Sequence, residues 1–467
     1  MSDLHIVVLG GGPAGCCAAY KLHNSGKARV TLIEQTQMLG GNSGSFEEEG
    51  QFLDFGSHRL HAACDPEILE DVKQMLGSDL AHRDRHGRIR LRGKWLHFPL
   101  KTTDLMMRLD KAFAFGAAWD LVSRTLFGKG KEGDTFASVL KANLGKTICE
   151  HFYFPYSRKL WGHEPTELSG IQARKRVSAG SVSKILKRLA KPPGAGKFYY
   201  PRKGYGQLSE IYAEHATRLG ADIKMGWSAS KAVQLPEGGF EVELTNKAGE
   251  KETVIADHVW STIPVTILCR MLQPPVPPEI IAAADKITYR SMVLVYLTLP
   301  VDQWTTTDAH YFPEANIRMT RMSEPKNYFG LTEPKGKTTL CAELPCEKGD
   351  EIWNMSDEAL GQLILKDMET AELPIHQPIK VFSRRLPQAY PIYTMGYERD
   401  LEAMDKWVDG VPNLLTYGRQ GFFAHDNTHH AFYMAYCAVD CLEPDGSFNK
   451  TRWNDYRKIF ATHVVED

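Results

Sequence analysis

The sequence predicts an α/β fold whose parallel, doubly wound sheet is assembled from separated stretches of the chain. A βαβ unit opens it: the apolar run 4–9 precedes a glycine turn and a helix, and the apolar run 30–33 ends at Glu34. Apolar, β-branched runs bounded by turn residues are typical of buried strands. The runs 254–264 and 414–417 predict strands that return to this sheet. Because 467 residues exceed one ordinary core, we expect an inserted, mixed helical and β-sheet domain between these segments.

The remaining elements follow in chain order from periodicity and chain-breaking residues. Short strands are expected around Trp95, and apolar residues at helical spacing predict helices over 104–115, 135–144 and 181–189. The Pro/Gly cluster 191–197 predicts a mobile surface loop, after which an amphipathic helix runs to Leu219. Strands are predicted over 222–244, a helix over 357–369 and a last helix over 430–442.

The first glycine turn indicates a bound dinucleotide. Gly10, Gly12 and Gly15 follow a strand and open a helix, which is the context that the GxGxxG fingerprint requires. The helix N-terminus offers free N–H groups to a pyrophosphate, and the glycines let the backbone approach it. An acid after the second strand binds ribose hydroxyls and disfavours NADP. The residues expected to contact the dinucleotide here are Gly10, Gly12, Pro13, Ala14, Gly15, Glu34 and Gln35.

A second glycine pair narrows the choice of dinucleotide. Gly40-Gly41-Asn42 follows the βαβ unit, and the segment 50–58 ends in Gly56-Ser57-His58. This opening resembles the FAD-binding segment of the superfamily of amine oxidases, protoporphyrinogen oxidases and UDP-galactopyranose mutases. The resemblance implies a Rossmann-like FAD-binding domain of the glutathione-reductase type, in which the second glycine pair lets the chain pass close to the ribityl-pyrophosphate arm of FAD. No cysteine or histidine falls in a recognised motif for a covalent flavin link, so we expect FAD to be bound non-covalently. NAD remains the less favoured alternative.

The resemblance also implies a division of the chain into two domains. Segments 1–80, 205–265 and 405–467 would form the FAD-binding domain, and segments 81–204 and 266–404 the substrate-binding domain.

Two histidines follow the second glycine segment. His58 and His61 have no carboxylate or cysteine at a useful spacing, so a metal site is not predicted. Ordinary packed or surface histidines are the alternative to a functional role. The resemblance implies that this loop lies against the isoalloxazine ring and that one of the two rings tunes the flavin.

The C-terminal segment 417–440 resembles the flavin motif of eukaryotic-type mutases. The resemblance implies that Gly418 packs a turn against FAD, that Arg419 lies between flavin and substrate, and that Asn427 contacts the cofactor. One departure concerns His425, which stands where the mutases have a tyrosine. A protonated histidine could form a charge-assisted hydrogen bond with phosphate, or it could serve a different substrate.

An arginine set distinguishes the candidate functions. The resemblance aligns Arg176 and Arg321 with arginines that meet the substrate phosphates, and Tyr390 with a tyrosine that contacts the diphosphate. Arginine suits this role because its planar fork binds phosphate bidentately and stays protonated. A mutase needs several of Arg176, Arg321, Arg385 and Arg419 to converge near the flavin, whereas an oxidase of hydrophobic substrates needs an apolar tunnel there.

Composition limits the partners. The formal net charge of −1 gives no general reason to bind nucleic acid or an anionic membrane, and no run of 18 apolar residues predicts a membrane span. A strand begins within a few residues of Met1, which leaves no room for a signal peptide, and nine scattered cysteines suit free thiols in the cytoplasm. Self-association is left open.

Two functions remain in competition. The first is a UDP-galactopyranose-mutase-like enzyme that uses flavin N5 on a nucleotide-linked sugar without net electron transfer. The alternative is an FAD-dependent oxidoreductase, of the amine oxidase or protoporphyrinogen oxidase kind, that passes a hydride from substrate to flavin. A non-catalytic flavoprotein is a third class, disfavoured by the clustered arginines and tyrosines.

Overall fold

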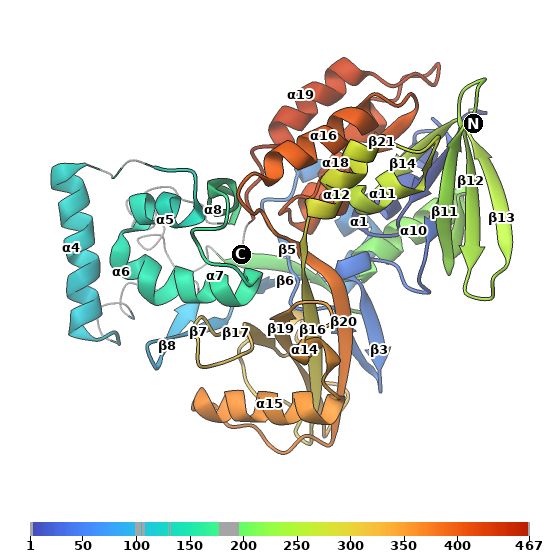
Figure 1. The fold of residues 1–467 in the computed structure, drawn as a ribbon. Coiled ribbons are helices and arrows are strands. Elements are labelled where there is room, and N and C mark those ends of the chain that lie inside the picture. Colours follow the sequence, from blue (N-terminus) through green and yellow to red (C-terminus); the bar gives the residue numbers. More distant parts are fainter. Residues whose placement is uncertain are drawn as a thin grey trace.

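A five-stranded parallel sheet joins segments from both ends and the middle of the chain (Figure 1). The computed structural model describes residues 3–98, 104, 108–128, 130, 132–176 and 196–465. Neighbouring strands are parallel throughout the order β10–β2–β1–β14–β21. The strands are β1 (His5–Leu9), β2 (Arg29–Glu34), β10 (Asp222–Met225), β14 (His258–Ser261) and β21 (Leu414–Thr416). The α/β fold predicted from the βαβ unit and the returning strands is confirmed.

Each face of this sheet is covered by a different layer. Helices α1 (Pro13–Asn24), α10 (Gln207–Leu219) and α18 (Thr428–Asp440) share one apolar core with it. The other face packs against β11 (Trp227–Gln234), β12 (Phe240–Asn246), β13 (Lys251–Ala256), β15 (Leu272–Gln273), α11 (Val265–Met271), α12 (Pro278–Lys286) and α16 (Tyr397–Asp409). Small residues in α1, such as Cys16 and Ala18, are fully buried because this helix lies close against the sheet.

The run 254–264 differs from its prediction as one strand. Its first part belongs to β13 of the four-stranded sheet, and only β14 joins the parallel sheet. Burial explains the division: β13 alternates between exposed and half-buried residues, whereas all four residues of β14 are buried. The chain changes sheets at Asp257, whose N–H donates to the carbonyl of His5.

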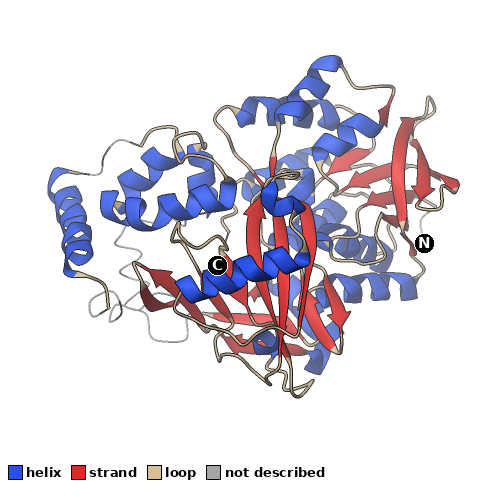
Figure 2. Cartoon of the chain, turned by 60° about the horizontal axis from the view of Figure 1, so that its bottom comes forward, coloured by secondary structure: helices blue, strands red, loops and turns tan. Residues whose placement is uncertain are grey.

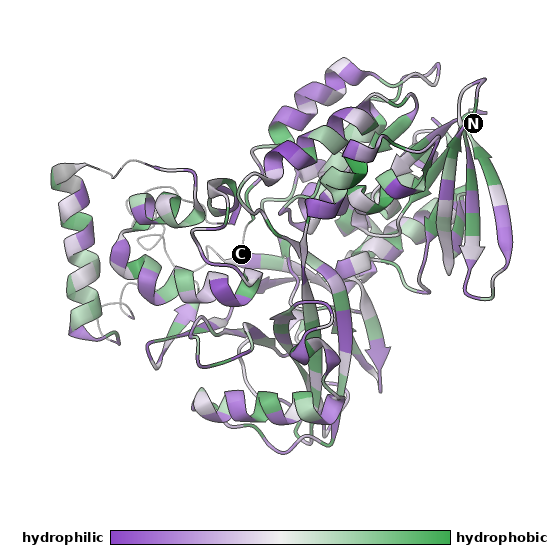
Figure 3. Cartoon of the chain, in the orientation of Figure 1, coloured by the Kyte–Doolittle hydropathy of each residue, from purple (hydrophilic) through white to green (hydrophobic). Residues whose placement is uncertain are grey.

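A seven-stranded sheet forms the second large unit, in the order β20–β16–β19–β18–β17–β7–β8. Helix α15 (Asp357–Thr370) lies across it (Figure 2) and buries Leu360, Ile364 and Met368, and hydrophilic and hydrophobic residues alternate along its length (Figure 3). The strands are β7 (Gly87–Leu91), β8 (Lys94–Phe98), β16 (Tyr289–Leu299), β17 (Ala309–Tyr311), β18 (Arg321–Ser323), β19 (Thr338–Cys346) and β20 (Lys380–Pro391). The predicted division into two domains stays a prediction.

Smaller sheets and a helical lobe complete the molecule. The hairpin strands are β3 (Ser45–Glu48) and β4 (Gln51–Asp54), and a three-stranded sheet contains β5 (Leu60–His61), β6 (Leu80–Asp84) and β9 (Lys197–Pro201). The lobe contains α4 (Lys111–Phe127), α5 (Phe136–Leu144), α6 (Lys146–Ile148), the π-helical turn Cys149–Tyr153, α7 (Phe154–Trp161) and α8 (Gly170–Arg176). The other short helices are α2 (Pro66–Leu76), α13 (Lys326–Phe329), α14 (Glu351–Asn354) and α17 (Gly418–Gly421).

Several predicted helices can be compared with this architecture. The helices predicted over 135–144 and 357–369 correspond to α5 and α15, and each begins after a Thr or Ser whose side chain accepts a backbone N–H. The helix predicted over 430–442 corresponds to α18, but it is not the last, because α19 (Lys450–Phe460) follows it. The predicted helix 181–189 and all but the last two residues of the predicted loop 191–197 lie outside the described residues.

The state of the cysteines and the length of the helices can be compared with the expectations from the sequence. All nine cysteines are buried as free thiols. Within the described part of the chain, we find no helix both long and apolar enough to cross a bilayer.

Candidate functional site

A cavity of ≈ 630 Å³ extends from the first glycine turn to the seven-stranded sheet. Its walls include the residues that directly follow β1, β2 and β14, at the carboxyl edge where open parallel sheets bind ligands. Most predicted site residues line it, namely Gly10, Gly12, Pro13, Ala14, Glu34, Gln35, Gly40, Gly41, Asn42, Ser57, His58, His61, Arg176, Arg321, Tyr390, Arg419 and Asn427. Four predicted residues are not part of the lining: Gly15, Gly56, Gly418 and His425.

The three glycines of the first turn have different structural requirements. Gly10 has φ +102°, a conformation that other residues rarely adopt. A Cβ on Gly15 would lie 1.9 Å from the carbonyl oxygen of Gly10, so this glycine permits close packing of helix on strand. A Cβ on Gly12 would meet nothing within 4 Å and would project into open space beside the cavity. The room at Gly12 is therefore room for a ligand.

Glu34 lies at the end of β2 with only 7% of its surface exposed. Its carboxylate accepts the N–H of Gly11 at 2.8 Å and both the N–H and the hydroxyl of Thr36 at 2.8 Å. These bonds fix the carboxylate at the cavity wall, where Oε2, which accepts only the N–H of Gly11, retains acceptor capacity for a ribose hydroxyl.

The second glycine pair lies against the first turn. The N–H of Gly40 donates to the carbonyl of Gly11, and a Cβ on Gly41 would lie 3.6 Å from the Cα of Gly12. Both glycines have positive φ. The neighbouring Asn42 amide donates to the carbonyl of Gln388 on β20, which links this turn to the second sheet.

The histidine loop is held rigidly at the cavity. Gly56 has φ +96°, and the N–H of Ser57 donates to Glu343 at 2.8 Å. The Nε2 of His58 lies 2.9 Å from the carbonyl of Phe55, and its ring stacks on Tyr205. Burial lowers the pKa of His58 to about 4, so its ring is neutral at neutral pH. His58 therefore offers the cavity no positive charge.

Arg321 is neutralised within the protein. Its Nε and Nη2 bond the two carboxylate oxygens of Glu343 at 2.8 Å each, a bidentate pair between neighbouring strands β18 and β19. Glu343 also holds the loop at Ser57. Arg321 lines the cavity, but its main partner is the carboxylate of Glu343. This pairing differs from the expected role of Arg321 as a phosphate ligand.

Arg176 and Arg419 lie beside the same aromatic ring in the cavity. Their guanidinium carbons lie 5.5 and 5.4 Å from the ring centre of Tyr390. Arg419 donates to the carbonyls of Ala389 and Asp426, and neither arginine has a carboxylate within ion-pair distance among the described residues. Burial, together with the charge of Arg176, lowers the pKa of Arg419. Two guanidinium groups beside one phenol make an anion-binding site.

The fourth predicted arginine is more exposed and is engaged by backbone. Arg385 donates to the carbonyls of Trp353 and Met355 at 2.7 Å each. It also lines the cavity, so all four arginines of the mutase hypothesis border the same cavity. The lining residues that sequence reasoning did not assign to the site include the charged Arg59, Arg85 and Glu343.

His425 departs from its predicted role. It is completely buried, it is not among the cavity-lining residues, and its ring packs edge-on against Trp161 and Tyr393. Burial lowers its pKa well below the ordinary value, and the positive charges of Arg176 and Arg419 act in the same direction. The ring is therefore neutral, and a charge-assisted bond to phosphate is not available to it.

The C-terminal motif presents a helix N-terminus to the cavity. Asn427 and Thr428 open α18 and line the cavity, so the positive end of the helix dipole faces a ligand there. Gly418 has φ +80°, and a Cβ on it would lie 2.9 Å from the Cβ of Ala14. Gly418 thus packs the C-terminal turn against the start of α1 instead of lining the cavity.

Comparison with known proteins gives one match to a family model. The model of the flavin-containing amine oxidoreductases matches residues 13–434. Among curated proteins, the chain is similar to a probable UDP-galactopyranose mutase of Klebsiella pneumoniae, with 24% identity over 46% of this chain and 54% of that protein. It therefore spans about half the length of that relative. It is also similar to coproporphyrinogen III oxidase of Bacillus subtilis (strain 168), with 20% identity over 86% of this chain and 91% of that protein.

Among solved structures, the chain is similar to a reduced UDP-galactopyranose mutase. The TM-score is 0.81 at 22% identity, and the alignment covers 99% of this chain and 100% of that one. At this identity the similarity shows a shared fold.

Proposed function

This chain belongs to the family of flavin-containing amine oxidoreductases, and within that family we propose that it acts on a nucleotide-linked sugar as a UDP-galactopyranose-mutase-like enzyme. Membership makes the chain an FAD-dependent flavoenzyme. Bound FAD supplies N5, which can act as a nucleophile when reduced or accept a hydride when oxidised.

The cavity suits FAD at its nucleotide end. The open space at Gly12, the apposed turn at Gly41 and the N-terminus of α1 form a cradle for a pyrophosphate. Glu34, which lines the cavity, would accept hydrogen bonds from the ribose hydroxyls. At the other end, the loop at His58 and the N-terminus of α18 would lie beside the flavin ring.

The pair Arg176 and Arg419 is the observation on which the mutase proposal rests. A sugar nucleotide carries a diphosphate, and cleavage at the anomeric carbon leaves negative charge on that leaving group. Guanidinium groups without carboxylate partners bind such a group and stabilise the charge that develops on it. The phenol of Tyr390 between them can donate a further hydrogen bond to a phosphate oxygen.

An oxidase is the second candidate, favoured by the aromatic part of the lining. Phe55, Tyr156, Phe198 and Tyr311 line the same cavity, and Arg176 and Arg419 would bind a substrate carboxylate as readily as a phosphate. Coproporphyrinogen III oxidase, one of the curated relatives, aligns over more of the chain than the mutase does.

Binding of UDP to the reduced protein tests the mutase proposal. We expect UDP and UDP-sugars to change the fluorescence of the reduced flavin. Arg176→Ala or Arg419→Ala should each weaken binding by roughly ten- to a hundredfold, since a hydrogen bond to a charged group contributes about 1.5–3 kcal/mol. FAD content should stay near normal in Arg176→Ala.

Arg385→Ala is the matched control because its guanidinium is already bonded to two carbonyls. It should weaken UDP binding less than the other two changes. The mutase proposal is wrong if UDP does not bind at millimolar concentration while a porphyrinogen or an amine bleaches the oxidised flavin anaerobically.

A further inference from the structure

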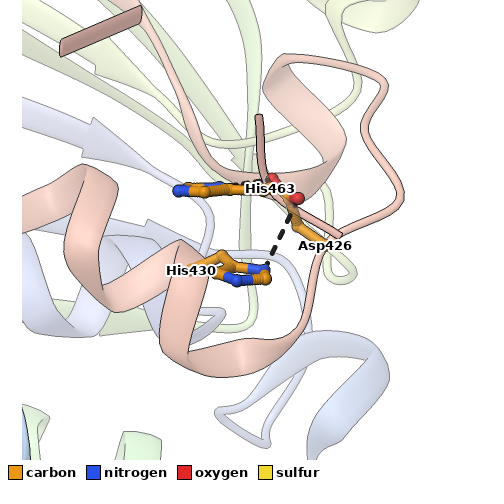
Figure 4. Close-up of side chains that lie close together, drawn as sticks. All are labelled: Asp426, His430 and His463. Carbon is orange, nitrogen blue, oxygen red and sulfur yellow. Dashed lines mark ion pairs between the residues drawn. The ribbon is translucent and has the colours of Figure 1, made fainter. Parts of the chain in front are cut away.

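A cluster of two histidines and one aspartate lies beside the cavity (Figure 4). Asp426 and His430 come from the turn before α18 and from its first turn, and His463 comes from the segment after α19. Figure 4 shows the carboxylate facing both rings. One ligand atom from each residue lies within 4.8 Å of the other two.

The carboxylate of Asp426 lacks the partners that burial demands. The residue is only 2% exposed, and neither carboxylate oxygen has a hydrogen-bond partner among the described residues. Its oxygens lie 3.6 Å from Nδ1 of His430 and 3.6 Å from Nδ1 of His463, too far for hydrogen bonds. The Nδ1 of His463 is likewise buried without a hydrogen bond. A buried carboxylate in this state calls for a cation.

We propose that Asp426, His430 and His463 bind a divalent transition-metal ion, Zn²⁺ by their donor chemistry. Two imidazole nitrogens and one carboxylate oxygen are ordinary zinc ligands, and tetrahedral bonds of about 2.0–2.1 Å place ligand atoms about 3.3–3.4 Å apart. The two oxygen–nitrogen separations of 3.6 Å need little contraction to reach that geometry. The fourth position is left for water or a ligand. The proposal does not depend on the identity of the substrate.

Binding requires two local adjustments. The rings of His430 and His463 stack with centres 4.1 Å apart and planes at 12°, so they must tilt apart for both lone pairs to meet one ion. The Nδ1 of His430 must also release the N–H of Asn427, which it accepts at 3.2 Å.

Neighbouring cations lower the affinity that we expect for the metal ion. Lys175 interacts electrostatically with Asp426, and the guanidinium of Arg419 bonds its carbonyl. Both weaken the attraction of a further cation, so we expect micromolar affinity and not the tight binding of a closed structural zinc site. A second cavity of ≈ 720 Å³, lined by Asp426 and His463, gives the ion a route to the site.

The bound ion would fasten the C-terminal segment to the flavin motif. His463 precedes Val465, which lines the first cavity and whose N–H donates to the carbonyl of Lys175. A metal joining His463 to the start of α18 would hold this segment against the cavity wall.

Titration of the chelator-treated, tag-free holoprotein with Zn²⁺ tests the site. We expect one ion per chain by calorimetry and a rise in the midpoint of thermal unfolding, because an ion that binds the folded state stabilises it. Asp426→Asn and His463→Ala should each weaken binding by about tenfold or more, since each removes one of three ligands. Lys175→Met should tighten it.

His376→Ala is the matched control, since His376 is exposed and outside the cluster; it should bind Zn²⁺ as the unaltered protein does. The far-ultraviolet circular dichroism of each variant verifies its fold. The proposal is overturned if the unaltered protein binds no stoichiometric ion, or if Asp426→Asn and His463→Ala bind it as tightly as His376→Ala.

Discussion

Two glycines of the first turn differ in whether the fold itself requires a glycine. Gly15 serves packing, because a Cβ there would collide with the backbone of Gly10. Gly12 has φ −77° and open space beyond its Cα, so the protein itself does not require glycine at that position. A ligand that approaches the backbone closely would explain it.

Gly12→Val should therefore give a folded protein without FAD. The valine Cβ would have no protein atom within 4 Å, so the side chain would extend into the space meant for the pyrophosphate. The measurement is the ratio of flavin absorbance to protein absorbance, with circular dichroism to verify the fold. Gly130→Val, at an exposed glycine away from the cavity, is the control and should keep its FAD. A fully loaded Gly12→Val protein would refute the placement of the cofactor.

At the scale of elements, the sequence predicted those helices and strands whose signals lie in residues close together along the chain. The βαβ unit and the helix predicted over 135–144 were visible because their signals are local. The sequence did not reveal that Glu343 neutralises Arg321, because the two residues meet through strand pairing across 22 positions. The burial of His425 depends on Trp161 and Tyr393, which come from distant segments of the chain. The neutral state of its ring could therefore not be predicted from the sequence either.

Lys159 fastens α7 to the chain that follows β17. Its ammonium donates to the carbonyls of Phe312, Glu314 and Met319. Lys159→Met would leave three carbonyls without this donor, so we expect a loss of about 2–4 kcal/mol in the free energy of unfolding. Urea unfolding measures it.

The control for this change is Lys146→Met. Lys146 is exposed, with a single ion pair at 3.9 Å, and removing it should alter stability by less than about 0.5 kcal/mol. Equal effects of the two substitutions would contradict the role given to Lys159.

For the whole molecule, buried titratable groups determine how stability depends on pH. Burial lowers the pKa of His58 to about 4 and of His310 to about 3, while it raises the pKa of Asp54 to about 6. Below about pH 6.5 the unfolded chain binds protons at the two histidines and the folded chain does not, so acid destabilises the fold. Asp54 acts in the opposite direction, because the folded protein binds its proton first. Between pH 7.5 and pH 5, each histidine lowers the free energy of unfolding by about 2 kcal/mol, and Asp54 raises it by about 1.4 kcal/mol. The effect of the two histidines is therefore the larger one.

His310→Phe isolates one of these contributions away from the cavity. His310 lies on β17 between Trp95 and Trp304, is 4% exposed, and can be replaced there by another ring. The unaltered protein should lose about 2 kcal/mol more than the variant between pH 7.5 and pH 5, because only its unfolded state gains a proton at this position. Urea unfolding at both pH values gives the four free energies, and packing changes cancel in the difference between pH values. The exposed His376→Gln should lose as much as the unaltered protein. If His310→Phe also loses as much, His310 is protonated in the fold as readily as in the unfolded chain, and its burial does not govern the response to acid.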